Sequence, residues 1–395
     1  MRILAVHNRY RIPGGEDAAF DAEVRLLRAR GHEVREAVAD NADSGLVNSL
    51  RMLSDSDWSQ RSFETISRMC REFRPDLAHV HNFWMSWTPS VHAAFQEAGV
   101  PTVQTLHNFR LLCANGLFLR HGQPCEDCVQ RSPWLGAVRR CYRNSAIASA
   151  AMVRMIAANR RRGTWDELVD AFITPGEHAR SRFEAGGLPV ERLFVKANVI
   201  EDYGDSSQPP SASRTFLFIG RLSPEKGIGV LLEAWKAMRR PADARLLLVG
   251  SGDRTEGLAE GVTCTGHLNR NRVNELLGEA RAVILPSICY ETFGNTVVEG
   301  FSRGRPAIVS SIGALPGLVE NGVTGLRFEP GDSNQLAARM ETLLESDSLC
   351  DRLGAKARAE YSSHYSDEAN YRTLARIYDF ALERAGRRHR RGNAA

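Results

Sequence analysis

Short apolar runs alternate with longer amphipathic stretches along the whole chain. In the first half, runs at residues 3–7, 34–38, 77–81, 102–106 and 171–174 have the length of buried strands. In the second half, similar runs lie at 215–219, 245–249, 262–264, 282–285 and 306–310. The stretches between them, such as 20–29, 229–238 and 334–344, carry apolar residues at helical spacing. This alternation predicts an α/β fold built from parallel sheets that helices cover.

A polar segment rich in proline and serine, residues 201–214, divides the chain into two halves with the same rhythm. We therefore expect a Rossmann-like domain at 1–200, a linker at 201–214 and a second Rossmann-like domain at 215–366. Ligands of such folds bind at the carboxyl ends of the strands, which predicts a site in a cleft between the domains. A helix at 367–384 should pack back toward the first domain, and 385–395 should form a loose basic tail.

The composition narrows the possible classes of protein. With 43% hydrophobic and 25% charged residues, a chain of 395 residues can bury proper cores, which excludes disorder and a small disulfide scaffold. The net charge of +4 is too small to indicate nucleic-acid binding by itself, so we expect no nucleic-acid partner. No apolar stretch approaches the ~20 residues of a membrane-spanning helix, and residues 1–6 look like a strand rather than a signal peptide. These features predict a cytoplasmic protein.

A strand-to-helix turn with two cations lies at residues 220–227, Gly-Arg-Leu-Ser-Pro-Glu-Lys-Gly. Such a turn presents backbone N–H groups and the positive end of a helix dipole to an anion. Arg221 can hold phosphate oxygens in a bidentate manner, and Lys226 adds a compact second charge. A phosphate site and a merely solvated loop fit these residues equally well.

Two glutamates, Glu291 and Glu299, lie eight residues apart around a turn at Gly294. Carboxylates suit hydroxyl-rich ligands because each can accept two O–H hydrogen bonds. The backbone N–H groups near residues 293–296 should point at the same place. An acid at a helix N-terminus would explain one of these glutamates without any ligand, but not both.

Together with Leu-Leu-Leu-Val-Gly-Ser-Gly at 246–252 and Val-Ile-Leu-Pro-Ser at 283–287, these motifs resemble the retaining glycosyltransferases of family 4. The segments at 304–309 and 320–325 agree with the same family. The resemblance implies the GT-B fold, two Rossmann-like domains that face each other across a cleft. It implies transfer of a sugar, as by a hexosyltransferase, from a UDP- or GDP-linked donor to an acceptor hydroxyl, with retention of configuration and no catalytic metal.

The resemblance also implies roles for the second-half residues. Arg221 and Lys226 would hold the donor diphosphate and stabilise the departing charge, Glu299 would bind the ribose, and Glu291 would contact the transferred sugar. The other implied donor-binding residues are Gly250, Gly252, His267 and Leu268 near the base, and Phe293, Gly294, Asn295 and Thr296 near the sugar.

In the first half, a loop with two glycines follows the first strand, and histidines end two later strands. Gly14 and Gly15 alone would indicate an ordinary turn, but the resemblance places them beside the donor. We expect the neighbouring acids Glu16 and Asp17, together with His81, on the acceptor side. A histidine such as His107 is more often structural, yet the resemblance places it at the donor sugar. It would polarise or position a group there, because in a front-face mechanism the leaving phosphate deprotonates the acceptor.

Four cysteines, Cys113, Cys125, Cys128 and Cys141, form an insertion that the family motifs do not require. A central Cys-x-x-Cys with two flanking thiols could close a tetrahedral structural zinc site. Metal is favoured over disulfides for this spacing in a cytosolic protein. Unligated thiols in a packed insertion are the alternative.

A basic stretch at 129–165 contains eight arginines and no acidic residue. The apolar residues between the arginines are Ile147, Met152, Val153, Met155 and Ile156. Such an amphipathic stretch fits an anionic membrane surface, here the inner face of the cell membrane, or a lipid-pyrophosphate acceptor. A solvated surface helix is the alternative.

These observations favour a glycosyltransferase with a glycan or lipid-linked acceptor, in bacterial cell-envelope polysaccharide or glycoconjugate biosynthesis. A nucleotide-sugar epimerase of GT-B fold would share the donor site but need no acceptor. A non-catalytic binding protein would use the basic stretch and leave nucleotide sugars untouched.

Overall fold

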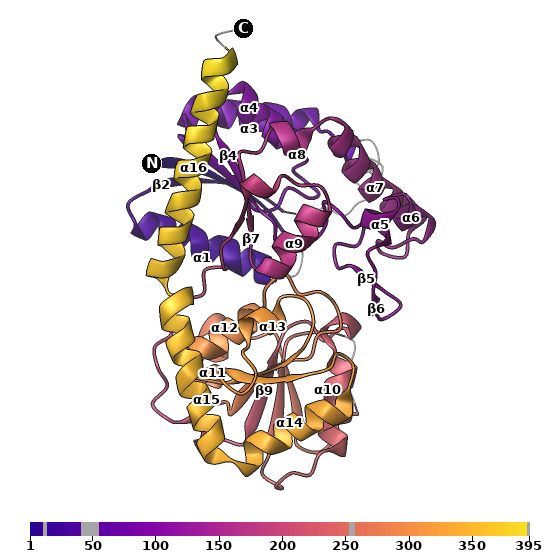
Figure 1. Cartoon of the computed structure of the whole chain (residues 1–395), viewed down its shortest axis with the longest axis vertical. Coiled ribbons are helices and arrows are strands. Elements are labelled where there is room, and N and C mark those ends of the chain that lie inside the picture. Colours follow the sequence, from indigo (N-terminus) through magenta and orange to yellow (C-terminus); the bar gives the residue numbers. More distant parts are fainter. Residues whose placement is uncertain (11–13, 41–54, 253–256, 393–395) are drawn as a thin grey trace. The chain divides into compact units, whose positions relative to one another are not determined.

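The computed structural model describes residues 1–10, 14–40, 55–252 and 257–392. The chain forms two compact units, each with its own sheet (Figure 1). The N-terminal unit comprises Met1–Phe118, Cys125–Val199 and Asn370–Ala395, and the C-terminal unit comprises Leu119–Pro124 and Ile200–Ala369.

The sheet of the N-terminal unit has six parallel strands in the order β2-β1-β3-β4-β7-β8. The strands are β1 (Arg2–Arg9), β2 (Glu33–Asp40), β3 (Leu77–Val80), β4 (Thr102–Thr105), β7 (Ala171–Thr174) and β8 (Leu193–Val195). Five of them confirm strands expected from the apolar runs. The edge strand β8 was not expected, because its three residues give no run and two of them are only partly buried.

Helices cover this sheet and close its core. The main ones are α1 (Gly15–Ala29), α3 (Gln60–Phe73), α4 (Ser90–Glu97), α7 (Ala146–Arg161) and α9 (Glu177–Ala185). Ser59 and Ser145 each accept a hydrogen bond from a first-turn N–H group, which caps α3 and α7. On one face, Phe20 and Val24 of α1 pack against Ile3 of β1, and all three side chains are buried.

The last helix, α16 (Asp367–Gly392), contributes to the same core. Leu374, Ile377 and Tyr378 are at most 2% exposed and lie in the core cluster that contains α1 and β1. The expectation that the helix ends at residue 384 and a loose tail follows is wrong, since α16 continues to Gly392. The physical reason is tertiary: Ala385 is buried, and Arg388 lies 3.2 Å from the buried carboxylate of Asp170.

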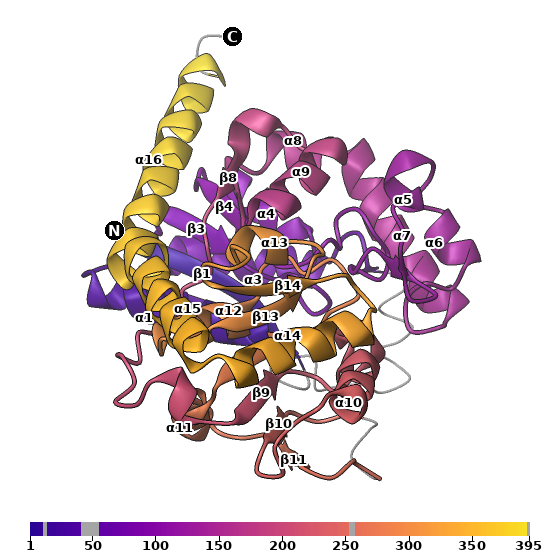
Figure 2. The ribbon, with the colours of Figure 1, turned by 60° about the horizontal axis from the view of Figure 1, so that its bottom comes forward.

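The sheet of the C-terminal unit also has six parallel strands, in the order β11-β10-β9-β12-β13-β14. The strands are β9 (Thr215–Ile219), β10 (Arg245–Val249), β11 (Val262–Gly266), β12 (Ala282–Leu285), β13 (Ala307–Ser310) and β14 (Gly325–Phe328). The helices include α10 (Ile228–Ala237), α11 (Arg270–Glu279), α12 (Asn295–Ser302), α13 (Leu315–Leu318), α14 (Ser333–Glu345) and α15 (Asp347–Glu360). Helices α10 and α14 pack side by side over a core that includes Trp235 and Met340 (Figure 2).

The segment 201–214, expected to be a linker, is an ordered part of the C-terminal unit. The hydroxyl of Ser211 donates to Asp351, and the buried guanidinium of Arg281 donates to the carbonyls of Ser211 and Ser213. Arg358 pairs with Asp202. These contacts come from residues far away in the sequence, so the local composition of the segment could not reveal them.

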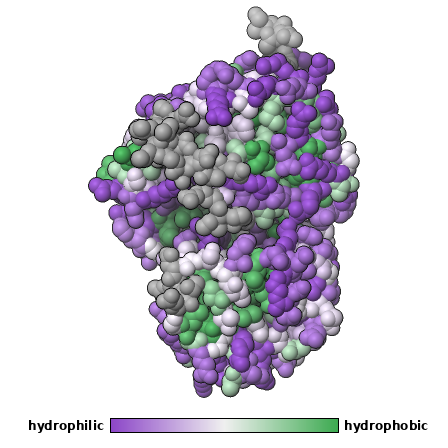
Figure 3. Space-filling model, turned by 180° about the vertical axis from the view of Figure 1, so that it is seen from behind, coloured by the Kyte–Doolittle hydropathy of each residue, from purple (hydrophilic) through white to green (hydrophobic). Residues whose placement is uncertain are grey.

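The surface drawn in Figure 3 is mainly hydrophilic, with hydrophobic residues in separate groups. The apolar residues expected to form a lipid-facing stripe on α7 are mostly inside, since Met152, Val153, Met155 and Ile156 are at most 1% exposed. Of that set only Ile147, at 61%, is exposed. Within the described ranges, no helix has both the length and the apolar character to cross a membrane.

Candidate functional site

The first candidate site lies at the carboxyl ends of β9 and β12 in the C-terminal unit. The chain leaves β9 at Ile219 and enters α10 at Ile228, with Gly227 at φ 72° between them. A Cβ atom on Gly227 would lie 1.8 Å from the carbonyl oxygen of Pro286, so only glycine lets the two loops pack this closely. The backbone of Ile288 also donates to the carbonyl of Glu225. The two motifs recognised separately in the sequence are therefore joined in space.

An ion pair connects these loops. Nζ of Lys226 donates to Oε1 of Glu291 at 2.7 Å, and the hydroxyl of Ser287 donates to the same oxygen at 2.5 Å. Burial is the largest single effect on both groups and opposes their charged forms, but the ion pair together with neighbouring polar and charged groups outweighs it. The net result is a raised pKa of Lys226 and a lowered pKa of Glu291. Arg221 is 61% exposed at its side chain, lies 3.2 Å from Glu225, and helps to lower the pKa of Glu291.

Glu299 lies one turn into α12, as the sequence predicts, and has a different environment. Burial raises its pKa, with the positive charge of Arg270 acting in the opposite direction. The start of α12 is held at the end of β9, because the hydroxyl of Thr296 donates to the carbonyl of Ile219 at 3.2 Å. Gly294, at φ 144°, is the residue that precedes the helix.

The other expected donor residues also follow strand ends of this sheet. Gly250 and Gly252 follow β10, and Cβ atoms there would lie 1.9 Å from the carbonyl oxygen of Gly220 and 2.3 Å from that of Leu222. His267 and Leu268 follow β11, and His267 is exposed. The residues of the C-terminal unit that were predicted to bind the donor therefore lie in loops at the carboxyl edge of one sheet.

In the N-terminal unit, the glycine loop is held by a buried acid. Residues 11–13 of this loop lie outside the described residues, whereas Gly14 and Gly15 open α1. Oδ2 of Asp17 accepts from the backbone N–H of Gly14 at 2.9 Å, and Oδ1 lies 2.9 Å from Nε2 of His7. Because Asp17 is 3% exposed and uses both oxygens in this way, its geometry fits a structural role rather than the acceptor contact expected.

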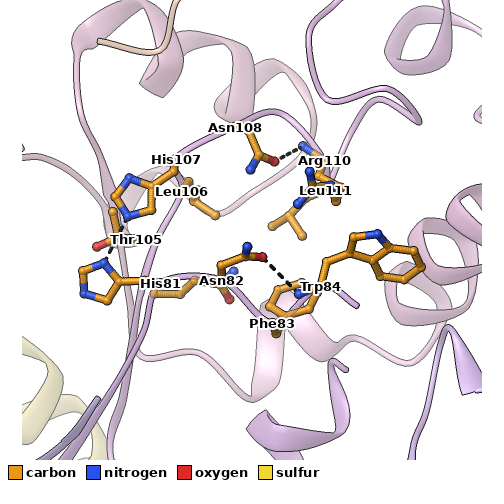
Figure 4. Close-up of a pocket in the computed structure, with 11 residues that line it drawn as sticks. His81, Asn82, Phe83, Trp84, Thr105, Leu106, His107, Asn108, Arg110 and Leu111 are labelled. Atoms are coloured by element: carbon orange, nitrogen blue, oxygen red, sulfur yellow. Dashed lines mark hydrogen bonds between the residues drawn. The ribbon is translucent and has the colours of Figure 1, made fainter. Parts of the chain in front are cut away.

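Glu16 belongs instead to a polar cluster beside a pocket. The hydroxyl of Tyr10 and the amide of Asn108 each donate to its carboxylate at 2.8 Å, and Arg110 lies 3.3 Å from the hydroxyl of Tyr10. Asn108 and Arg110 also line the pocket of Figure 4, together with His81 and His107. Tyr10, Asn108 and Arg110 were not among the residues predicted from the sequence. Their positions shortly after β1 and β4 could have indicated a site there, because ligands of such folds bind at the carboxyl ends of strands.

The two pocket histidines contact each other. Nδ1 of His81 lies 3.0 Å from Nε2 of His107 (Figure 4). Burial lowers the pKa of both imidazoles, that of His81 to about 3 and that of His107 well below its ordinary value. Both rings are therefore neutral at physiological pH, which suits hydrogen bonding rather than charge.

The four cysteines of the insertion are close neighbours without a disulfide. Cys113 and Cys128 are buried, and Cys125 and Cys141 are partly buried. Burial, followed by the three other thiols, raises the pKa of Cys128 to about 11. Among the described residues, no three of these sulfur atoms lie within 4.8 Å of one another.

Comparisons with known proteins agree with this architecture. The family model "Glycosyl transferase 4-like domain" matches residues 14–199, and "Glycosyl transferases group 1" matches residues 213–346. The glycogen synthase of Mycobacterium tuberculosis is 26% identical over 330 residues, which cover 78% of this chain and 69% of that protein. A phosphatidyl-myo-inositol mannosyltransferase of Mycobacterium leprae is 32% identical over 227 residues, covering 54% of this chain and 60% of that protein.

Solved structures show the same fold. The Anabaena protein HepE in complex with UDP-glucose aligns with a TM-score of 0.67 at 19% identity, covering 96% of this chain and 100% of that one. The sucrose-phosphate synthase of Thermosynechococcus elongatus aligns with a TM-score of 0.68 at 16% identity, covering 96% and 98%. The two family models together span most of the chain, and the chain thus belongs to the family 4 glycosyltransferases of GT-B fold.

Proposed function

We propose that this protein transfers a sugar from a nucleotide-diphosphate sugar to an acceptor hydroxyl, with retention of configuration and without a catalytic metal. The observation that carries the proposal is the group of Lys226, Glu291 and Arg221 at adjoining strand ends. Two cations beside a carboxylate can bind a diphosphate and a sugar hydroxyl at one place. The same cations can stabilise the charge of the leaving diphosphate, which makes a metal unnecessary.

In this proposal the donor is UDP- or GDP-linked. Its ribose binds Glu299, and its base lies near Gly250, Gly252, His267 and Leu268. Glu291, with the residues from Phe293 to Thr296, holds the sugar. The relative HepE supports a nucleotide-sugar donor, since it was solved with UDP-glucose and with UDP.

Thermal unfolding in the presence of UDP, GDP, ADP and their sugar conjugates tests the donor site. A ligand that binds the native state stabilises it by mass action and so raises the melting temperature. At a hundredfold excess over Kd, the free energy of unfolding increases by about 2.7 kcal/mol. We expect a shift with one nucleotide that disappears in Glu299→Ala and persists in Glu279→Ala, which removes an exposed glutamate at the end of α11. No shift with any nucleotide would contradict the donor assignment and favour a non-catalytic binding protein.

Turnover of the donor so identified tests the reaction. Arg221→Ala and Lys226→Ala should each lower kcat by about a hundredfold or more, as expected when a group that stabilises transition-state charge is lost. NMR of the product should show the anomeric configuration of the donor, and excess EDTA should leave the rate unchanged. Conversion of the donor alone into an isomer would instead indicate an epimerase.

We place the acceptor in the N-terminal unit, at the pocket of Figure 4 and the polar cluster of Tyr10, Glu16, Asn108 and Arg110. A partly buried arginine, Arg110, among hydroxyl and amide groups suits a hydroxyl-rich or phosphate-bearing molecule. A glycan or a lipid-linked sugar has this chemistry. The proposed place of the enzyme is therefore polysaccharide or glycoconjugate biosynthesis in a cell envelope.

We also propose a peripheral membrane location through the insertion and the start of α7. Trp134, Val138 and Ile147 are 48%, 79% and 61% exposed, and they flank the exposed arginines Arg140 and Arg143. The short helix α6 (Leu135–Val138), which carries Val138, packs against α7, which carries Ile147. An exposed tryptophan with aliphatic and basic neighbours suits the interface of an anionic bilayer.

Finally, we propose that the four cysteines bind a structural zinc ion. Their thiols are mutual neighbours, and the hairpin of β5 (Leu119–Arg120) and β6 (Gln123–Pro124) leads directly into Cys125. Tetrahedral thiolate coordination would draw the four sulfur atoms closer together than they lie here and deprotonate them. Zinc would stabilise the insertion and take no part in the transfer.

A further inference from the structure

The pocket of Figure 4, which belongs entirely to the N-terminal unit, is lined by two residues with a buried N–H group that has no hydrogen-bond partner. These groups are Nε1 of Trp84 and Nε of Arg110. In the figure, both side chains lie on the side of the pocket away from His81 and His107. A buried donor without an acceptor costs free energy, so a ligand that brings acceptor atoms to this pocket gains binding free energy from them.

Two amide oxygens that line the same pocket already have partners. Oδ1 of Asn82 accepts from the backbone N–H of Trp84 at 3.0 Å, and Oδ1 of Asn108 accepts from the backbone N–H of Arg110 at 3.0 Å. Among the described residues that line the pocket, the buried side-chain nitrogen and oxygen atoms without a partner are the two donors of Trp84 and Arg110. The pocket therefore suits a chemical group that only accepts hydrogen bonds.

Arg110 also brings a positive charge that has no direct counter-ion. Its Nη1 and Nη2 atoms each donate to the hydroxyl of Tyr10 at 3.3 Å, and that hydroxyl donates to Glu16 at 2.8 Å. Burial raises the pKa of Tyr10, so the hydroxyl is neutral at physiological pH. Within the described part of the chain, no carboxylate oxygen lies within 4.0 Å of the guanidinium nitrogens. The charge of Arg110 is thus balanced only indirectly, through a neutral hydroxyl.

A carboxylate or a phosphate group meets both conditions. The oxygens of an ionised carboxylate or phosphate accept hydrogen bonds, and a guanidinium group binds them with parallel N–H donors. The Nε–H group of Arg110 is still available for such a pair. A neutral sugar hydroxyl can also accept from this group, but it brings no negative charge to the cation and so forms the weaker interaction.

We propose that Arg110 is a specificity-determining residue that binds a carboxylate or phosphate group of the acceptor. The oxyanion site is argued from the pocket alone, and only its assignment to the acceptor rests on the proposed function. The acceptor is then an acidic sugar or a sugar that carries phosphate, and the pocket discriminates against neutral sugars. Tyr10 and Glu16 hold the guanidinium group by its Nη atoms and leave Nε–H for the ligand.

The experiment is an NMR titration of the full chain labelled with ¹⁵N-tryptophan, at constant ionic strength. The probes are D-glucose, D-glucuronate and D-glucose 6-phosphate, which share one sugar ring and differ in the group on the last carbon. The indole N–H signal of Trp84, assigned from the spectrum of Trp84→Phe, reports on the pocket. Trp235 is the internal reference, because its indole donates to the carbonyl of Glu260 at 2.9 Å in the C-terminal unit.

We expect the signal of Trp84 to shift with the anionic probes and to stay unchanged with glucose at the same concentration, while Trp235 does not respond. A shift with glucuronate alone would identify a carboxylate as the group recognised, and a shift with the sugar phosphate alone would identify a phosphate. No response of Trp84 to either anion, or an equal response to glucose, would overturn the proposal.

Variants test whether Arg110 is the cause. Arg110→Gln removes the charge and should weaken binding of the anionic probe about ten- to a hundredfold, as for a lost hydrogen bond to a charged group. Arg110→Lys keeps the charge without the planar donors and should bind with intermediate affinity. Arg68→Gln, which removes an exposed charge on α3 of the same unit, should bind as the wild type does. Unchanged affinity of Arg110→Gln would overturn the proposal, and the wild-type comparison of charged and neutral probes decides if that variant does not fold.

The thermal-unfolding assay with nucleotides separates this inference from the proposed function. If Trp84 responds to an anionic sugar but no nucleotide stabilises the chain, the proposed function fails and the oxyanion site stands. If a nucleotide stabilises the chain and Trp84 responds to none of the anions, the donor assignment stands and this inference fails.

Discussion

At the scale of single residues, the pair of Lys226 and Glu291 combines two demands. The two charges stabilise each other against burial, and under the proposed function both must also be able to bind a ligand. A buried charge whose partner is removed is costly, because its desolvation is no longer compensated. A diphosphate would share Lys226 with Glu291 and so would not leave either group without a counter-charge.

The pair should make stability depend on pH in a defined direction. Because the pKa of Glu291 is lowered in the folded chain, its contribution is present above the ordinary value of 4.5 and is lost as the pH falls through the folded value. Because the pKa of Lys226 is raised in the folded chain, its contribution to stability is fully present below its ordinary pKa of 10.5. That contribution is lost only as the pH rises through the folded value. We expect Glu291→Gln to cost about 1–3 kcal/mol near neutral pH.

Urea unfolding of both proteins between about pH 7 and pH 3.5 measures this difference. The gap between wild type and variant should narrow as Glu291 of the wild type becomes protonated. Glu225→Gln, in the same motif but paired with the exposed Arg221, should have a smaller effect. A gap that stays constant down to the lowest pH would show that the ion pair does not stabilise the fold.

At the scale of elements, close backbone contacts join the loops at the strand ends. We predict that Gly250→Ala costs about 1–3 kcal/mol, because the new methyl group would meet the carbonyl oxygen of Gly220. Gly317→Ala is the matched control in the same unit, since its Cβ would have no neighbour within 4 Å. Thermal unfolding compares the two, and equal stability of both variants would contradict the close approach.

The cysteine insertion permits a second prediction at this scale. Elemental analysis of the purified chain should find about one zinc per molecule, and Cys128→Ser should remove it and lower the melting temperature. Cys264→Ser changes a partly exposed thiol in the other unit and should keep the metal. Purified wild-type protein without zinc, with four thiols that react freely, would leave the insertion as a packed loop.

At the scale of the whole molecule, the N-terminal unit contains both the first and the last residues of the chain. We predict that Leu374→Ala in α16 destabilises the N-terminal unit by about 2–5 kcal/mol, as expected for a fully buried leucine. Arg376→Ala, an exposed position on the same helix, should change stability by less than about 0.5 kcal/mol. Removal of residues 370–395 should prevent folding of that unit. A truncated protein with native-like circular dichroism and native-like thermal unfolding would contradict this prediction.

The proposed membrane surface of Trp134, Val138 and Ile147 permits a prediction about binding to lipid vesicles. Replacing Trp134, Val138 and Ile147 by serine together should abolish sedimentation with vesicles that contain anionic lipid. Val190→Ser, which alters another exposed aliphatic residue of the same unit, should leave it unchanged. Raised salt should weaken binding of the wild type. Equal sedimentation with neutral and anionic vesicles would argue against the role of the arginines.

Local patterns were sufficient for most of the fold. The apolar runs predicted ten of the twelve strands in the two large sheets, because a buried parallel strand is a short continuous apolar segment. Motifs directly after those strands predicted where Arg221, Lys226, Glu291 and Glu299 lie, because parallel strands bring their carboxyl ends to one edge. The short edge strand β8 and the arginine-containing β14 lack such a run.

The sequence by itself thus determined the α/β class, the repeated strand–helix units and the donor motifs. The tertiary structure alone decided which side chains became buried partners: Asp17 beneath the glycine loop, α16 in the first core, and Glu23 between Lys196 and the histidines. The physical reason is the range of the interactions. Periodicity and turn chemistry act over a few residues, whereas burial and charge pairing join residues that only the finished fold brings together.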